Sequence, residues 1–171
     1  MKFTVNSTKA LNVLLWILKK KPNVDLYNIN KIMFAADCYH LNKYGRLVYG
    51  EEYVAMRLGT VPSFMYELMK IKDKMPFFYS SEYGLSSYAE PDFNLLSASD
   101  IEALEYGISE YADLTFAEVK EKNHQHRAWK KHEKELETKN KVEISYEDMI
   151  DNPEVLEYLE ELGDMTEKMG F

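Results

Sequence analysis

Residues 33–70, MFAADCYHLNKYGRLVYGEEYVAMRLGTVPSFMYELMK, decide the fold of this chain. The segment opens inside an apolar pattern with helical spacing that begins near Asp25. Gly45 is expected to end this helix, because glycine readily adopts the left-handed conformation that closes a helix. The pattern therefore predicts a helix over about 25–45.

After this helix the pattern changes to short β-type runs separated by glycine. Residues 46–49 and 53–57 are rich in β-branched and aromatic side chains, and Gly50 lies between them. They predict a small hairpin or turn-rich β patch. Pro62 suits the first turn of a helix and predicts a third helix to about residue 72. The paired acids Glu51 and Glu52 are expected to face solvent.

Helical signals also occupy both sides of this segment. Ser7 or Thr8 is expected to cap the first helix, and Ser/Thr-x-x-Glu capping boxes start at Ser99 and Thr115. Helices are expected over about 7–20, from Ser99 to Tyr111, from Thr115 toward Glu135 and from Asn152 to Gly163. The sequence predicts a mainly α fold: one compact domain of six or seven helices with a small antiparallel β patch near residues 46–80.

Composition sets the class of protein. The chain has 171 residues, of which 46% are hydrophobic, so one domain with a real core is expected. The single cysteine, Cys38, favours a reducing, cytoplasmic compartment. No apolar run resembles a signal peptide or a membrane span, so neither secretion nor membrane association is expected.

The net charge of −8 is unevenly distributed along the chain. Residues 142–171 hold 10 acids and 1 base, a net charge of −9, which leaves +1 for the rest of the chain. This asymmetry disfavours nucleic-acid binding, which needs a basic face. The acidic helix within 151–171 is expected to pack on the same domain. Its alternatives are a partner's groove and imitation of nucleic-acid charge.

Two groups of residues invite a catalytic or metal-binding interpretation. His124, His126 and His132 lie close together in the sequence, but helical geometry turns the first two to different sides and no HExxH-type spacing supports them. Asp37 and His40 are spaced for a carboxylate–imidazole pair, and Cys38 could react through a separate histidine. Structural roles are favoured for both groups. No metal or other cofactor is expected.

Trp129 stands in the basic sequence HQHRAWKKHE, which also contains Lys130 and Lys131. It could stack on a base, anchor a protein partner or belong to the core. The core role is the favoured prediction, and the base-stacking role supports the alternative of a nucleic-acid-associated phage regulator.

The order of short motifs resembles the Panacea domain of the SocA-like antitoxin family. The matching residues are Met33-Phe34-Ala35-Ala36-Asp37, His40-Leu41, Tyr44-Gly45-Arg46-Leu47, Gly50, Tyr53, Ala55-Met56, Gly59-Thr60-Val61-Pro62-Ser63, Tyr66-Glu67-Leu68, and, further on, Leu96-Ser97-Ala98-Ser99-Asp100-Ile101-Glu102-Ala103-Leu104, His124, Ala128-Trp129 and Ile144-Ser145-Tyr146-Glu147-Asp148. The resemblance covers about residues 8–150, and residues 1–150 would form the Panacea-like domain. Thr60 replaces the usual proline of the family pattern and restores a backbone N–H there, and Phe34 replaces the usual tyrosine.

The resemblance implies a mostly helical, non-enzymatic module that binds and neutralises a toxin encoded beside it. Neutralisation would block the toxin or present it to a Clp-type protease. The family motif and partner-binding residues are expected to be Asp37, His40, Gly45, Arg46, Gly50, Tyr53, Gly59, Pro62, Tyr66, His124 and Trp129. The alternative to a binding module, besides a nucleic-acid regulator, is a hydrolase that uses Asp37 and His40 in a cleft with His124.

Overall fold

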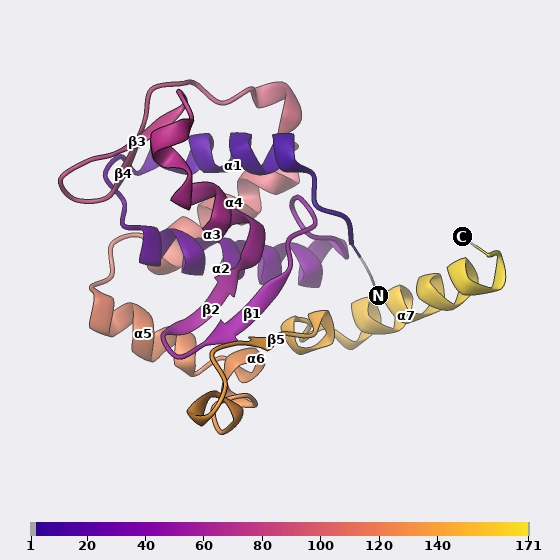
Figure 1. The fold of residues 1–171 in the computed structure, drawn as a ribbon. Coiled ribbons are helices and arrows are strands. Elements are labelled where there is room, and N and C mark those ends of the chain that lie inside the picture. Colours follow the sequence, from indigo (N-terminus) through magenta and orange to yellow (C-terminus); the bar gives the residue numbers. More distant parts are fainter. Residues whose placement is uncertain (1–2, 171) are drawn as a thin grey trace.

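The computed structural model describes residues 3–170, and Figure 1 shows its helices gathered around one central helix, α2. The α-helices of the described range are α1 (Ser7–Lys20), α2 (Leu26–Tyr44), α3 (Ser63–Lys70), α4 (Ala98–Tyr111), α5 (Phe116–His124), α6 (Arg127–Lys130) and α7 (Pro153–Lys168). Short 3-10 helices are η1 (Lys72–Lys74), η2 (Phe93–Leu95), η3 (Glu135–Glu137) and η4 (Tyr146–Met149). The mainly α fold is confirmed. No helix in this range combines the length and the apolar character that crossing a membrane requires.

Polar caps define the ends of the two N-terminal helices. Asn6, rather than Ser7 or Thr8, caps α1: its side chain accepts a backbone N–H from the first turn at 3.0 Å. Asp25 caps α2, and Gly45 closes it with φ +72°. The predicted bounds of α2 are therefore confirmed at both ends.

Helix α4 packs closely along α2 because one of its residues has no side chain. A Cβ on Gly107 would lie 2.3 Å from the carbonyl oxygen of Ile32, so only glycine allows this approach. The Asn28 side chain of α2 then donates to the carbonyl oxygens of Tyr111 and Leu114 at 2.9 and 3.0 Å. The first of these bonds pairs a carbonyl group at the end of α4, where a helix leaves its last carbonyl groups unpaired, and the second pairs one in the segment that follows.

Two small antiparallel sheets complete the fold. Their strands are β1 (Tyr53–Met56), β2 (Gly59–Pro62) and β5 (Val142–Glu143) in one sheet, and β3 (Phe78–Ser80) and β4 (Leu85–Ser87) in the other. In the first sheet β1 lies in the middle, with Val54 opposite Val61 and also opposite Glu143. The predicted β patch is confirmed. Residues 85–87, which lie beyond the predicted patch, also form a strand, β4.

The predicted first arm of the hairpin, residues 46–49, is not a strand. Its backbone groups bond to side chains of α2 instead of to a neighbouring strand. The N–H of Val48 donates to Asp37 Oδ1 at 2.8 Å, and the carbonyl oxygen of Arg46 lies 2.7 Å from His40 Nδ1. The hairpin therefore forms later in the sequence than predicted. It consists of β1 and β2, and Gly59 follows directly after its turn.

The start of α3 shows that Glu51 is a buried cap rather than a solvated acid. Glu51 is 0% exposed, and its carboxylate accepts the backbone N–H groups of Phe64 and Met65 at 2.9 Å. The Tyr49 hydroxyl donates to it at 2.6 Å. A negative group is favourable at a helix N-terminus, where N–H groups lack partners. Pro62 precedes this helix as its N-cap residue and belongs to β2.

The C-terminal half contains shorter helices than the sequence predicts. Ser97 and Asp100 form the capping box of α4, two residues before the predicted one, whereas the predicted box at Thr115 is confirmed. The helix that starts there ends at His124 and does not continue to Glu135. A separate helix, α6, begins after it: His126 is its N-cap residue, and the His126 ring accepts the N–H of Ala128 at 3.1 Å.

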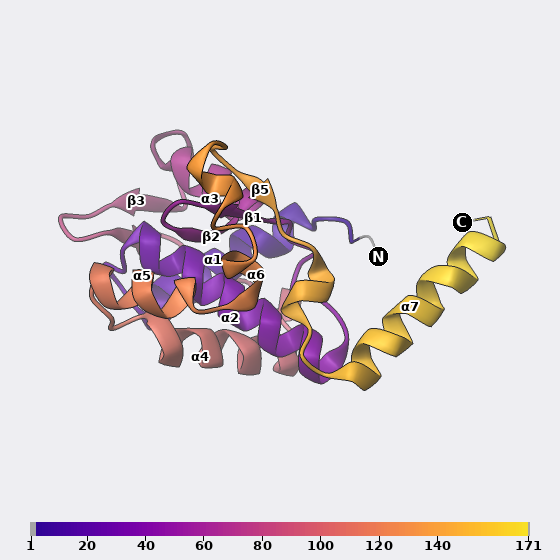
Figure 2. The same cartoon turned by 90° about the horizontal axis from the view of Figure 1, so that it is seen from below.

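Helix α7 extends away from the rest of the protein (Figures 1 and 2). Asn152 caps it, and Gly163 lies within it rather than at its end. The first half of α7 contacts the body through Val155, Leu156 and Leu159, which pack against a small apolar cluster beside β1, α6 and η4. The main core lies among α1, α2, α3 and α4.

Candidate functional site

Asp37, at the centre of the family motif, is fully buried and joins three segments. Its Oδ1 accepts the N–H of Val48 at 2.8 Å, and its Oδ2 accepts the Tyr53 hydroxyl at 2.5 Å. That hydroxyl also lies 3.0 Å from the carbonyl oxygen of Met33. Burial raises the pKa of Asp37 to about 7. The carboxyl group therefore connects α2, the 46–49 segment and β1.

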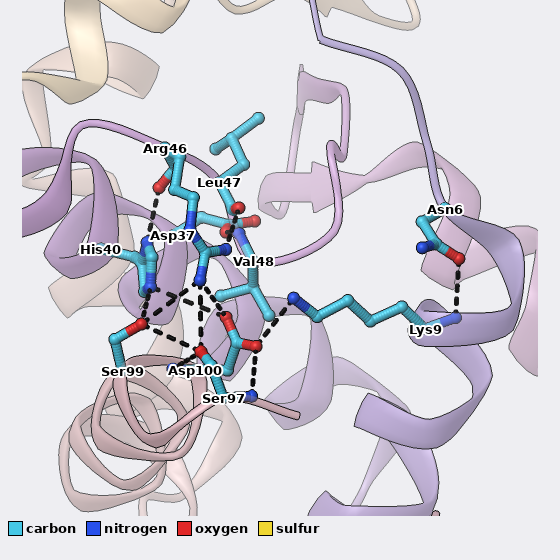
Figure 3. A network of polar contacts seen from close by, with 10 residues as sticks. All are labelled: Asn6, Lys9, Asp37, His40, Arg46, Leu47, Val48, Ser97, Ser99 and Asp100. Atoms are coloured by element: carbon cyan, nitrogen blue, oxygen red, sulfur yellow. Dashed lines mark hydrogen bonds and ion pairs between the residues drawn. The ribbon is translucent and has the colours of Figure 1, made fainter. Parts of the chain in front are cut away.

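His40 lies one turn further along α2 and contacts the same 46–49 segment (Figure 3). Its Nδ1 carries the proton, because the Arg46 carbonyl oxygen at 2.7 Å can only accept. Its Nε2 then accepts the Ser99 hydroxyl at 3.0 Å. Burial lowers the pKa of His40, which keeps the ring neutral near pH 7.

Asp100, at the start of α4, is the charged centre of this network. The family resemblance includes it, but it is not among the expected motif and partner-binding residues. Its side chain is 0% exposed and contacts Lys9 Nζ at 2.7 Å, Arg46 Nη2 at 3.2 Å and the N–H of Ser97 at 2.8 Å (Figure 3). Burial opposes its ionisation, but Lys9 and Ser97 outweigh that effect and hold the pKa of Asp100 below its usual value. The Ser97-x-x-Asp100 spacing, which is that of a capping box, is the sequence pattern that could have identified Asp100.

We call Asp37, His40, Arg46, Tyr53, Ser97, Ser99 and Asp100, with Lys9, the signature network. Its members come from α1, α2, β1, α4 and the segments between them. The hydrolase alternative needs Asp37, His40 and His124 to converge on a cleft. Asp37 and His40 are instead buried, and each bonds to different groups. No polar contact joins Asp37, His40 and His124 in the part of the chain that the structure describes.

Cys38 does meet a separate histidine, but the geometry does not activate the thiol. Its Sγ lies 3.9 Å from Nε2 of His126. Nδ1 of this ring accepts the N–H of Ala128, so the proton of the neutral ring sits on Nε2 and faces the sulfur. Burial raises the pKa of Cys38 well above its ordinary value, whereas a nucleophilic cysteine needs a lowered one.

A second set of motif residues fastens the hairpin to the C-terminal helices. Asn123 Oδ1 accepts the N–H of Thr60 at 2.8 Å, and its Nδ2 donates to the Thr60 hydroxyl at 2.9 Å. This pair explains the departure of Thr60 from the family's proline, because the restored N–H has a buried acceptor. Gly59, with φ +125°, is required beside it: a Cβ there would lie 2.2 Å from Asn123 Oδ1.

Trp129 is a core residue, as predicted, and is 4% exposed. Its Nε1 donates to the carbonyl oxygen of Met56 at 2.7 Å, and its ring stacks on His124 with centroids 3.6 Å apart. The nucleic-acid alternative needs a free aromatic face at this position, and His124 covers one face. Among the described residues no three His, Cys, Asp or Glu side chains form a group that could hold a metal ion.

The remaining motif residues occupy turns and a cavity wall. Gly50 has φ +84°, and a Cβ there would lie 2.1 Å from the carbonyl oxygen of Thr4, so glycine is required. Tyr66 is half-buried on α3 and lines a cavity beside Lys31. The motif residues are thus divided between the signature network, the hairpin contacts, turns and this cavity.

Two surface features remain outside the family motif. A groove of about 850 Å³ runs between α2, α4, α5 and the start of α7, and both Tyr106 and His126 line it. From Tyr158 to its C-cap residue, α7 exposes an apolar stripe, defined as Tyr158, Leu162, Met165 and Met169, whose exposed fractions are 57, 41, 56 and 64%.

Comparison with known protein families gives a match over much of the chain. The model of the family described as "Antitoxin SocA-like, Panacea domain" matches residues 29–130. The match runs from α2 through the hairpin to α6 and covers more than half of the 171 residues. No curated protein and no solved structure gives a significant match. The chain belongs to the SocA-like antitoxin family and carries its Panacea domain.

Proposed function

We propose that this protein is an antitoxin that binds and neutralises a toxin encoded beside it in a bacterial or prophage genome. The interaction would take place in the cytoplasm. Residues 1–150 would form the Panacea-like scaffold, and the acidic helix within 151–171 would contact the toxin. The single observation that carries this assignment is the exposed apolar stripe of α7.

The stripe has the features of a binding helix. Tyr158, Leu162, Met165 and Met169 follow one another at intervals of four, three and four residues, so they share one face of α7. The first half of α7 contacts the body through Val155, Leu156 and Leu159. The helix then extends away from the body (Figure 2), and the side chains of the stripe are exposed. An amphipathic helix of this kind places its apolar face in a hydrophobic groove of a partner.

Charge indicates the chemistry of that partner. Helix α7 also carries six acids: Glu154, Glu157, Glu160, Glu161, Asp164 and Glu167. The best complement is a protein groove with an apolar floor and a basic rim, because opposite charges at the rim steer association and align the helix. We therefore expect the cognate toxin to present such a groove.

Co-expression with the neighbouring open reading frame tests the antitoxin function. The neighbour expressed alone should stop growth, and growth should return when this protein is present. A neighbour that is harmless alone, or that stays toxic in the presence of this protein, contradicts the proposed function. Toxin abundance separates the two modes of neutralisation, since presentation to a Clp-type protease lowers the amount of toxin only while that protease is active.

Charged substitutions test the role of α7. Leu162→Glu combined with Met165→Glu should abolish neutralisation and weaken toxin binding by at least about 30-fold, since one hot-spot side chain contributes about 2 kcal/mol. The matched control is Tyr83→Glu with Tyr88→Glu, which alters residues that are 72 and 70% exposed away from α7. Loss of binding in the control but not in the α7 variant would assign the interface to the β3–β4 region instead.

A further inference from the structure

Lys31 is a buried lysine without a counter-ion. It lies on α2 and is 1% exposed. Its Nζ lies 4.1 Å from the centre of the Tyr27 ring, and no carboxylate or carbonyl oxygen of the described residues bonds to it. Gly59 makes room for this side chain, since a Cβ on that residue would lie 2.9 Å from Lys31 Cε. A buried ammonium group normally has a partner, because desolvation of an isolated charge is costly.

Lys31 faces a cavity of about 500 Å³ between α2, the β1–β2 hairpin and α3. Arg57 also lines this cavity, whereas no carboxylate of the described residues does. Apolar and aromatic side chains, among them Met56, Val61 and Tyr66, form much of the wall. The size, the apolar wall and the two cationic groups match a site for a small organic anion.

Asn30 supplies a third polar group to the same cavity. Its Oδ1 is buried and accepts no hydrogen bond from the described part of the chain. Such an acceptor usually has a partner, since leaving it unpaired costs about 1–3 kcal/mol. A ligand that fits all three groups must therefore carry a negative charge and, next to it, a hydrogen-bond donor.

We propose that this cavity binds a carboxylate with a neighbouring N–H group, the chemistry shared by the C-terminal residue of a peptide and by a free N-acylated amino acid. Lys31 and Arg57 bind the carboxylate, Asn30 Oδ1 accepts the N–H, and the wall at Met56 and Val61 receives an apolar side chain. This site is separate from the α7 stripe, so ligand binding here can be tested independently of toxin neutralisation.

The first test is a calorimetric titration with N-acetyl-L-leucine against its neutral amide, N-acetyl-L-leucinamide, which has the same shape without the charge. The carboxylate should bind and the amide should bind at least about tenfold more weakly, because charged hydrogen bonds are the stronger ones. Equal affinity for the two compounds overturns the inference. Inorganic phosphate is the third probe, and binding as tight as that of N-acetyl-L-leucine would also overturn it.

Lys31→Met tests the assignment of the cation, because methionine has a similar length and suits an apolar site. The variant should lose at least about tenfold in affinity for N-acetyl-L-leucine while its urea unfolding remains cooperative. Arg57→Gln changes an exposed side chain and should also weaken binding, so the inference stays testable if Lys31→Met does not fold. Unchanged affinity in both variants overturns the assignment.

Proton uptake provides an independent readout. Burial lowers the pKa of Lys31 to about 7, and a bound carboxylate should raise it, so binding at pH 8 should take up a proton. The other ionisable groups near Lys31 are Tyr27, Arg57, Tyr66 and His124. Burial lowers the pKa of His124 and raises that of Tyr27 to about 12, so neither of these two titrates at pH 8.

The binding enthalpy should consequently change with the ionisation enthalpy of the buffer, and this dependence should disappear in Lys31→Met. A binding enthalpy that is the same in all buffers would contradict the role of Lys31. The source of the ligand follows from peptide length. Tighter binding of N-acetyl-Gly-Gly-Leu than of N-acetyl-L-leucine would identify a chain terminus, and weaker binding a free small molecule.

Discussion

Removing the carboxyl group of Asp37 should destabilise the whole domain. In Asp37→Ala the N–H of Val48 loses its acceptor and the Tyr53 hydroxyl loses the closer of its two acceptors, both in the core. An unpaired buried polar group costs about 1–3 kcal/mol, so the expected loss is about 2–5 kcal/mol of unfolding free energy. Since a domain of this size is stable by about 5–15 kcal/mol, the loss is a large fraction of the total.

Asp37→Asn should be milder and should reveal the charge state of the carboxyl group. Burial raises the pKa of Asp37 from 3.8 to about 7, so the folded protein holds a proton there that the unfolded chain releases. The stabilisation from this proton is complete below pH 3.8 and is lost as the pH rises through about 7. Asparagine does not titrate, so the penalty of Asp37→Asn relative to wild type should shrink from pH 5 to pH 7, by up to about 1.4 kcal/mol per pH unit.

Urea unfolding followed by tryptophan fluorescence measures both effects, because Trp16 and Trp129 are 1 and 4% exposed. Comparing each variant with wild type at the same pH cancels the contributions of the histidines. Asp164→Asn, on the exposed face of α7, is the matched control and should cost less than about 0.5 kcal/mol at every pH. A penalty for Asp37→Asn that grows with pH would refute a protonated Asp37, and a cost below 1 kcal/mol for Asp37→Ala would refute its role in the core.

Four further substitutions test other contacts by the same unfolding assay. Gly59→Ala should lower the unfolding free energy by about 2 kcal/mol or more, since φ of Gly59 is +125° and the new Cβ would lie 2.2 Å from a buried side-chain oxygen. Gly163→Ala should instead stabilise the protein by about 0.5–1 kcal/mol, because Gly163 lies within a helix and none of the described atoms would lie within 4 Å of its new Cβ. Equal effects of the two would contradict the close packing at the hairpin turn. Trp129→Phe should cost about 1–3 kcal/mol, because the carbonyl oxygen of Met56 loses its donor; a neutral result would show that water replaces it. In wild type, relative to Lys31→Met, stability should increase from pH 7 toward 10.5, since the unfolded chain binds a proton on Lys31 that the folded protein has released. A stability difference that does not increase over that range would show that Lys31 stays charged in the folded protein.

Much of the fold was predictable because its signals are local. Helix α2 begins at Asp25 and ends at Gly45, as the caps indicate, and Thr115 opens α5 through a capping box that spans four residues. Such signals act through neighbouring backbone groups and do not depend on the rest of the molecule. The order of motifs between residues 29 and 130 also sufficed to predict the family that the comparison shows.

The errors occurred where a side chain competes with local backbone preference. Residues 46–49 have strand-forming composition, yet Asp37 and His40 bond their backbone groups and prevent a strand there. The helix expected from Thr115 toward Glu135 ends early because the His126 ring caps a new helix. In both cases the decisive partner is a side chain whose direction follows from packing rather than from composition.

Local sequence patterns are enough to predict most of the helices, the place of the β patch and the family. Which polar residues are buried, and with what partner, depends on the folded arrangement of the whole chain. Glu51 became a helix cap, Asp100 the centre of the signature network, and Lys31 a cation without a counter-ion. The reason is physical: the free energy of burying a charge depends on groups that folding brings from distant parts of the chain, and no local pattern encodes their distance.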